Sequence, residues 1–370
     1  MGADTVFNRN LWDVPFHFWS AALFWLGCMV GSFLNVCIHR MPLGLSVITP
    51  PSHCPRCKYA IPWWLNVPLF TWLMLRGRCR NCGAPISPRY FLVELLTGLL
   101  FLGVWLQFGR SSAPVALILC LFVAGLIVAT FIDFEHFIIP DEITIGGMVA
   151  GFLLSMLVPA LHGQNTLLGA ILASGLGLAV GGGVIYAILR LGKLLFGRKR
   201  VALPADTRII FGESAVVLPD KEIPYEELFY RPSDKIVLEA RTVELVDRCY
   251  WDTTVCLSPA QLTVGGDAFN PEDVKHLEAV SAQITLPQEA MGFGDVKFMA
   301  AIGAFLGWQA TLFSLMVSSM IGAAVGVALI AIGRRAWSSR LPYGPYIAAA
   351  ALLWLFGGKA LWNAIFLPPP

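Results

Sequence analysis

Seven long apolar stretches, most of them without any charged residue, decide what this 370-residue chain can fold into. A helix needs about 20 mostly apolar residues to cross the hydrocarbon core of a membrane. The stretches are Phe18–Ile38, Tyr90–Phe108, Pro114–Ile132, Ile143–Leu161, Leu167–Leu189, Phe298–Ile332 and Tyr346–Leu367. Because Phe298–Ile332 is too long for one span, we expect two short spans turning near Gly307, or a re-entrant first half. The sequence therefore predicts an all-α polytopic membrane protein with about eight transmembrane helices.

The charged residues are few and unevenly distributed. Only 14% of the residues are charged, against roughly 25% in soluble domains, which excludes an ordinary soluble protein. Residues 201–290 contain seven Lys or Arg and sixteen Asp or Glu, a net charge of −9, whereas the whole chain has a net charge of +2. Such acidity either recruits a basic partner or only keeps a domain soluble. We interpret residues 198–290 as a soluble insertion between the fifth and sixth spans.

Short β-like runs within the insertion are separated by prolines. They are Arg208–Phe211, Ala215–Leu218, Lys235–Ala240 and Thr242–Val246. A helix-start signal follows at Asn270-Pro271-Glu272-Asp273. The pattern predicts a small, strand-rich domain.

Lys and Arg concentrate in alternate loops, which sets the orientation of the spans. Residues 39–89 carry seven Lys or Arg and no acid, and basic residues also follow the fifth span, from Arg190 to Arg200. Another basic loop contains Arg334, Arg335 and Arg340. Counting spans places the same loops on one side. We therefore expect a multi-pass membrane protein with the N-terminus outside and the insertion in the cytoplasm.

Four of the nine cysteines form two Cys-x-x-Cys pairs, Cys54 with Cys57 and Cys79 with Cys82. Each pair lies near Pro or Gly, so two tight turns can bring four thiolates around a tetrahedral ion, most naturally zinc. Four thiolates leave no position for water, which makes the predicted zinc structural. The alternative is four free or redox-active thiols, and a cytoplasmic location argues against disulfides.

Two aspartates lie at membrane boundaries. Asp133 falls at the end of the third span and Asp295 at the start of the sixth, so both are expected at the same depth on the cytoplasmic side. Ionisable groups at such depths are costly and usually functional. If the two carboxyl groups meet, they share one proton and can work as general acid and base. Alternatively, each is a helix-end residue, with Asp295 paired to Lys297, or the pair is a transporter's proton site.

Five motifs together resemble the bacterial type IV prepilin peptidase family, over about residues 15–195 and 288–365. They are Gly31–Val36 with Ile38, Arg40 and Pro42, the two Cys-x-x-Cys pairs, Arg89–Leu95, Asp133–Asp141, and Gly292-x-Gly294-Asp295-x-Lys297. The motifs occur in the family's order. The insertion departs from the family pattern, in which a short loop joins the fifth span to the Gly-x-Gly-Asp helix.

The resemblance implies an inner-membrane enzyme with two activities. It cleaves the basic leader of prepilins or pseudopilins after a glycine, and it methylates the new N-terminal amine with S-adenosylmethionine. Asp133 and Asp295 then form the catalytic dyad, Asp141 is the weaker candidate, and the four cysteines bind zinc. Methyltransferase residues do not carry over, and the region of Glu94 is where we expect them. Asp133, Glu135, Asp141, Glu142 and Asp295 would form an acidic rim that attracts the basic leader.

The predicted organisation has five parts. Residues 1–38 form the N-terminal segment and first span, 39–89 the zinc-binding domain, 90–197 spans two to five, 198–290 the insertion, and 291–370 the last spans. The expected partners are prepilin substrates, the lipid bilayer, and components of a pilus or secretion assembly, and no nucleic acid. Two further alternatives are a peptidase without methyltransferase activity and a non-catalytic assembly scaffold.

Overall fold

A computed structural model describes residues 15–196, 198–219, 221–225, 228–229, 234–287, 292–332 and 341–366. The chain divides into two compact units, one of Met1–Tyr186 with Gly292–Pro370 and one of Ala187–Met291. The basic residues Arg334, Arg335 and Arg340, which contributed to the predicted orientation, lie outside the described residues.

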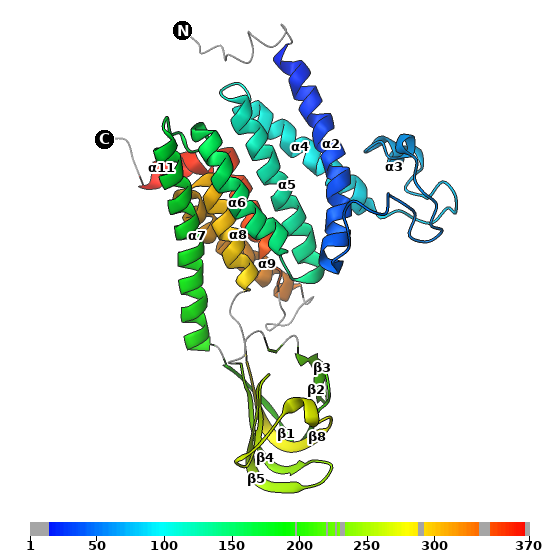
Figure 1. The fold of residues 1–370 in the computed structure, drawn as a ribbon, viewed down its shortest axis with the longest axis vertical. Helices are drawn as coiled ribbons and strands as arrows, with labels where there is room; N and C mark the ends of the chain where they lie inside the picture. The colour runs from blue at the N-terminus through cyan, green and yellow to red at the C-terminus, as the bar shows by residue number, and fades with distance from the viewer. Residues whose placement is uncertain are drawn as a thin grey trace. The chain divides into compact units, whose positions relative to one another are not determined.

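The first unit is a bundle of helices (Figure 1). Its helices are α2 (Phe16–Arg40), α3 (Phe70–Met74), α4 (Pro88–Phe108), α5 (Ala113–His136), α6 (Asp141–Leu157), α7 (Leu167–Phe196), α8 (Phe293–Leu306), α9 (Trp308–Ala331), α10 (Gly344–Leu353) and α11 (Lys359–Phe366), with a π-helical turn at Trp354–Gly358 between the last two. The part of α7 after Tyr186 belongs to the second unit. Short 3₁₀ turns cover Met41–Leu43, Trp63–Leu65 and Pro159–His162.

Six helical segments among the described residues are long and apolar enough to cross a membrane. They are Phe16–Leu43, Pro88–Phe108, Ala113–His136, Leu167–Gly192, Trp308–Ala331 and Gly344–Phe366. The two other predicted spans are helical but short, since α6 has 17 residues and α8 has 14. The prediction of a membrane protein made of helices is thus confirmed, while the count of eight spans remains a prediction.

Helix α8 packs unusually closely against α7. A Cβ atom built on Gly177 of α7 would lie 2.1 Å from the carbonyl oxygen of Gly303 on α8. The reciprocal Cβ on Gly303 would lie 2.0 Å from the Gly177 oxygen. Near the C-terminal end of α8, the Ala304 carbonyl oxygen accepts a hydrogen bond from Ser174 Oγ of α7 at 2.9 Å. Backbone therefore meets backbone here, and the small residues fix where α8 lies.

The second unit contains an eight-stranded antiparallel sheet. Its strands are β1 (Arg198–Phe211), β2 (Ala215–Leu218), β3 (Lys221–Pro224), β4 (Ile236–Glu244), β5 (Cys249–Leu257), β6 (Leu262–Val264), β7 (Asp267–Phe269) and β8 (Leu277–Pro287). Their order is β3-β2-β1-β8-β4-β5-β6-β7, and inward-facing side chains such as Ile209, Val255 and Ile284 form its own apolar core. The strand-rich nature predicted for the insertion is confirmed.

Two details of the predicted insertion are wrong. The helix-start signal at Asn270 leads only to a 3₁₀ turn, Pro271–Asp273, because the residues that follow alternate in burial with period two and form β8. The two runs on either side of Arg241 are one continuous strand, β4. In addition, strands β3, β5, β6, β7 and β8 were not predicted. In β5, several residues are exposed on both faces.

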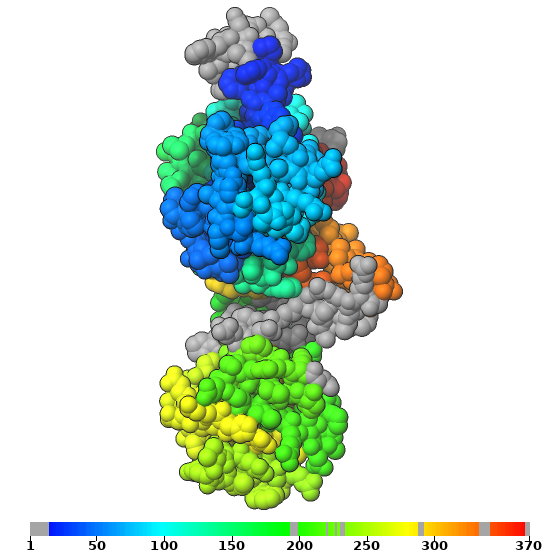
Figure 2. Space-filling view, turned by 90° about the vertical axis from the view of Figure 1, so that its right-hand side faces the viewer, coloured from blue at the N-terminus to red at the C-terminus, as the bar shows by residue number. Residues whose placement is uncertain are grey.

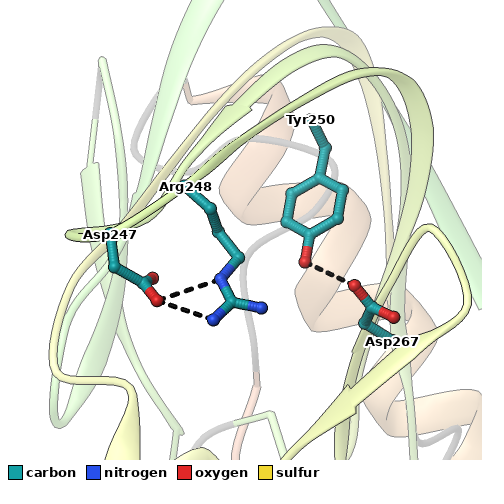
Figure 3. A network of polar contacts seen from close by, with 4 residues as sticks. All are labelled: Asp247, Arg248, Tyr250 and Asp267. Carbon is teal, nitrogen blue, oxygen red and sulfur yellow. Dashed lines mark hydrogen bonds and ion pairs between the residues drawn. The ribbon is translucent and has the colours of Figure 1, made fainter.

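Polar contacts between side chains fix one end of this sheet (Figure 3). Arg248 donates to Asp247 Oδ2 from Nε at 3.0 Å and from Nη2 at 2.7 Å. The Tyr250 hydroxyl donates to Asp267 Oδ2 at 2.7 Å, which links β5 to β7. Arg248 thus compensates the charge of Asp247 within the domain itself.

Candidate active site and metal centre

Asp133 lies in the last turn of α5 and is 6% exposed. The helix ends because Phe137 adopts a left-handed conformation, φ 55°, and its N–H donates to the Asp133 carbonyl oxygen at 3.0 Å. Pro140 then caps α6. This tight turn folds Ile139 back towards Asp133, and it explains why the aspartate and the proline occur at this short spacing.

Asp295 lies in the first turn of α8 and is 8% exposed. Gly292 caps the helix, and its carbonyl oxygen accepts a hydrogen bond from the Asp295 N–H at 3.2 Å. Both aspartates are therefore buried at helix ends, where an isolated carboxylate is costly.

Ile139 connects the two aspartate sites. A Cβ atom on Gly294, next to Asp295, would lie 3.6 Å from Ile139 Cβ. A Cβ atom on Gly344, the first residue of α10, would lie 3.1 Å from Ile139 Cδ1 and 2.9 Å from Asp133 Oδ2. The fold thus brings the two aspartates into one buried region.

Gly344 is a site residue that sequence reasoning missed. Its backbone N–H donates a 2.8 Å hydrogen bond to Asp133 Oδ2 across 211 positions of sequence. Pro345 marks a helix start in the sequence, but this signal does not indicate which distant acid the Gly344 N–H meets.

Two ion pairs surround this region and change the predicted acidic rim. Arg89 at the start of α4 pairs with Glu135, and Lys297 pairs with Asp141 rather than with Asp295. With these two acids paired and the two aspartates of the dyad buried, Glu142 is the member of the rim that is exposed and forms no ion pair with any described residue. The negative surface offered to a basic peptide is therefore smaller than the sequence suggested. Asp141, already the weaker catalytic candidate, is exposed and held by a cation.

The four cysteines of the predicted metal site lie together. All four Sγ atoms are within 4.8 Å of one another, and the pairs Cys54–Cys82 and Cys57–Cys79 are each 3.9 Å apart. The segment that carries them, light blue in Figure 2, lies on the face of the helical unit turned to the viewer. Sequence spacing alone was sufficient to find this cluster.

The two turns that carry the cysteines have the same backbone geometry. Cys54 N–H donates to the Tyr59 oxygen at 3.0 Å, as Cys79 N–H does to the Ala84 oxygen at 2.8 Å. Lys58 and Gly83 occupy equivalent left-handed positions, with φ of 58° and 66°. Each turn is a knuckle that presents two sulfur atoms to the same point.

The sulfur atoms fit a tetrahedral zinc ion. Zn–S bonds of about 2.3 Å require sulfur atoms about 3.8 Å apart, close to the 3.9 Å found for two of the pairs. Asn81 Nδ2 lies 3.6 Å from Cys57 Sγ, and this hydrogen bond, together with one from the Tyr59 backbone, lowers the pKa of Cys57 to about 6. This favours the thiolate, which is the form that binds metal.

Glu94, in the region where methyltransferase residues were expected, connects the cysteine-containing segment to α4. Its side chain is 8% exposed, and Oε2 accepts a 2.7 Å hydrogen bond from the Leu69 N–H. Leu69 has φ 61°, so the chain adopts an uncommon conformation there to make this contact. The position of Glu94 shows a structural role and leaves its role in methyl transfer an expectation.

Comparison with known families accounts for most of the helical unit. The sequence matches the bacterial peptidase A24 N-terminal domain over residues 25–108. It matches the type IV leader peptidase family over residues 120–199 and 277–327, which leaves most of the insertion unmatched. The chain belongs to the type IV leader peptidase family. The resemblance seen in its motifs is thereby confirmed.

Several curated relatives carry the name prepilin leader peptidase/N-methyltransferase. The protein of Myxococcus xanthus is 49% identical over 149 residues, which cover 40% of this chain and 44% of that protein. The protein of Aeromonas hydrophila is 29% identical over 359 residues, covering 90% of this chain and 89% of the relative. The protein of Pseudomonas aeruginosa is 26% identical and covers 89% of this chain and 88% of the relative. No solved structure matches the chain.

Proposed function

We propose that this member of the type IV leader peptidase family is an intramembrane aspartic endopeptidase and N-methyltransferase. It cleaves the basic leader of type IV prepilins or pseudopilins after glycine on the cytoplasmic face of the inner membrane. It then methylates the new N-terminal residue with S-adenosylmethionine as methyl donor. The observation that carries the proposal is the position of Ile139, which lies beside Gly294, the neighbour of Asp295, and beside the space that Gly344 leaves next to Asp133.

The chemistry of two adjacent buried carboxyl groups supports peptide hydrolysis. Two such groups cannot both ionise easily, so they hold one proton between them. The ionised member accepts a proton from water, and the protonated member polarises the scissile carbonyl group. Their burial keeps bulk water away from the charges and strengthens both effects.

The cysteine cluster supports the two-activity form of the enzyme over a peptidase alone. Related peptidases without methyltransferase activity usually lack the four cysteines. In this chain all four are present, and their sulfur atoms converge. Cys54, Cys57, Cys79 and Cys82 would hold the zinc ion, which stabilises the knuckles and offers no open position for a substrate.

The decisive experiment compares the purified protein with Asp133→Asn and Asp295→Asn, using a prepilin peptide that contains its leader. We expect both variants to lose cleavage by at least about 10³-fold, because each leaves the dyad without one of its two proton-transfer groups. Asp141→Asn is the matched control, since this acid is exposed and ion-paired. Cleavage that persists in both dyad variants would refute the peptidase assignment.

Mass spectrometry of the product tests the second activity. The processed peptide should begin at the residue after the leader glycine and carry one additional methyl group. A cleavage-dead variant supplied with pre-cut peptide should still methylate it, which would indicate two separate sites. A processed terminus without the methyl mass would instead favour the peptidase-only alternative.

A further inference from the structure

The start of α10 holds Asp133 through the backbone. The Gly344 N–H donates to Asp133 Oδ2 at 2.8 Å, and both residues are buried. Neighbouring N–H groups are not available for this role, because Pro345 has none and the Tyr346 N–H donates to the Tyr343 oxygen at 3.1 Å. The first N–H of a helix has no partner within its own helix, and here it finds one in Asp133.

No side chain fits at Gly344. A Cβ atom there would lie 2.9 Å from Asp133 Oδ2 and 3.1 Å from Ile139 Cδ1, both shorter than ordinary contacts. Glycine is therefore required so that the backbone can approach the carboxylate closely.

Helix α9 fixes the position of this helix start. The Tyr343 hydroxyl lies 2.9 Å from Ser318 Oγ and 3.0 Å from Ser319 Oγ, within hydrogen-bond distance of both. Tyr343 caps α10, so the two serines hold the residue next to Gly344. The serines of α9 thus hold the side chain of Tyr343, and the peptide that follows Tyr343 carries the Gly344 N–H that donates to Asp133.

We propose that Gly344 positions Asp133 and keeps it ionised, so that Asp133 is the general base of the dyad and Asp295 carries the shared proton. This inference rests on the proposed peptidase function. A backbone N–H at a helix N-terminus favours a negatively charged acceptor. Asp295 also lies in a first helical turn, but its carboxyl group accepts no comparably short hydrogen bond from the described residues.

Three basic side chains near this end of the helices contact other acceptors rather than the Asp133 carboxylate. Arg89 is paired with Glu135, and Lys297 with Asp141. Arg40, at the end of α2, donates to the Ser46 and Pro50 carbonyl oxygens. Other titratable side chains at this end, among the described residues, include His39, Tyr90, His136, Glu142, Tyr343 and Tyr346.

The proposed roles give a balanced reaction. Asp133 Oδ1 takes a proton from water as the water oxygen bonds to the scissile carbonyl carbon, and Asp295 gives its proton to the carbonyl oxygen. The tetrahedral intermediate then breaks at the C–N bond. The proton on Asp133 passes to the departing amine nitrogen, and one hydroxyl proton returns to Asp295.

The test is the pH dependence of kcat/KM for a prepilin peptide, measured for the full-length wild type, Gly344→Ala and Tyr343→Phe. Loss or weakening of the hydrogen bond raises the pKa of the base, so the acid limb should move to higher pH, by up to about one unit for Gly344→Ala. We expect kcat to fall about tenfold or more with KM nearly unchanged. Tyr343→Phe should move both quantities in the same direction by less.

Tyr225→Phe is the matched control, because the Tyr225 hydroxyl donates to the Gly212 oxygen within the insertion. Its profile should superimpose on that of the wild type. If Gly344→Ala does not fold, Tyr343→Phe decides. An unchanged acid limb in the folded variants would overturn the role of Gly344, even with both Asp→Asn variants inactive. Failure of the peptidase function itself would appear separately, as cleavage that survives both Asp→Asn substitutions.

Discussion

Replacing Gly177 by alanine tests whether the close approach of α7 and α8 sets the position of Asp295. The new Cβ would lie 2.1 Å from the Gly303 carbonyl oxygen, and an ordinary contact begins at 3.4 Å. Relief of the clash therefore requires α8 to move by about 1.3 Å relative to α7. Asp295 is two helical turns from Gly303 and moves with the helix.

The expected magnitudes follow from that displacement. Forcing extra atoms into a packed interface costs about 1–3 kcal/mol, and a misplacement of about 1 Å at reacting groups costs about 10²-fold in rate. Gly183→Ala is the matched control on the same helix, because a Cβ there meets no atom within 4 Å. Alanine is the better helix former by about 1 kcal/mol, so this variant should be at least as stable as the wild type.

The assay measures kcat for a prepilin peptide and the Tm of each purified variant in the same detergent. Gly177→Ala should lose about 10²-fold in kcat and some degrees in Tm, and Gly183→Ala should lose neither. Wild-type kcat and Tm in Gly177→Ala would refute the reasoning, since they would mean that α8 need not be held against α7 at this point.

Two further predictions concern the metal centre and the substrate. Cys82→Ser should reduce bound zinc from about one ion per chain to near zero and expose the cysteine-containing segment to protease, because three thiolates and a hydroxyl make a poor tetrahedral site. Cys249→Ser, another exposed cysteine, should retain the zinc, and equal metal content in both variants would rule out the site. Glu142→Gln should raise the KM for a leader-containing peptide about two- to fivefold at low salt, while Glu135→Gln should change it less, because Glu135 is already paired with Arg89. Equal KM values for the two variants, or no effect of salt, would count against charge recognition of the leader.

The features that sequence predicted well depend only on residues that are close together in the chain. Long uncharged runs gave the membrane helices, since length and hydropathy are sufficient to identify a span. Two Cys-x-x-Cys pairs gave the metal cluster, because a knuckle needs only four residues to aim two sulfur atoms. Such features do not depend on how distant segments pack.

The insertion was harder because its sheet is assembled from distant strands. Strand β8, near its end, pairs with β1 at its start, with Arg198 opposite Pro287. The two ends of the domain are therefore adjacent, which is the usual condition for inserting one domain into another. The insertion consequently imposes no separation between its two ends.

The dyad itself could be suggested by sequence but not assembled from it. Membrane depth placed Asp133 and Asp295 at the same level, yet depth does not say which helices are neighbours. That information lies in backbone contacts made by residues without side chains: Gly177 against Gly303, and Gly344 against Asp133. A glycine contributes little to any pattern of hydropathy or charge. Its role in packing can be inferred only when the position of the opposing backbone is known. The residues that position the acids were for this reason the ones that sequence reasoning could not identify.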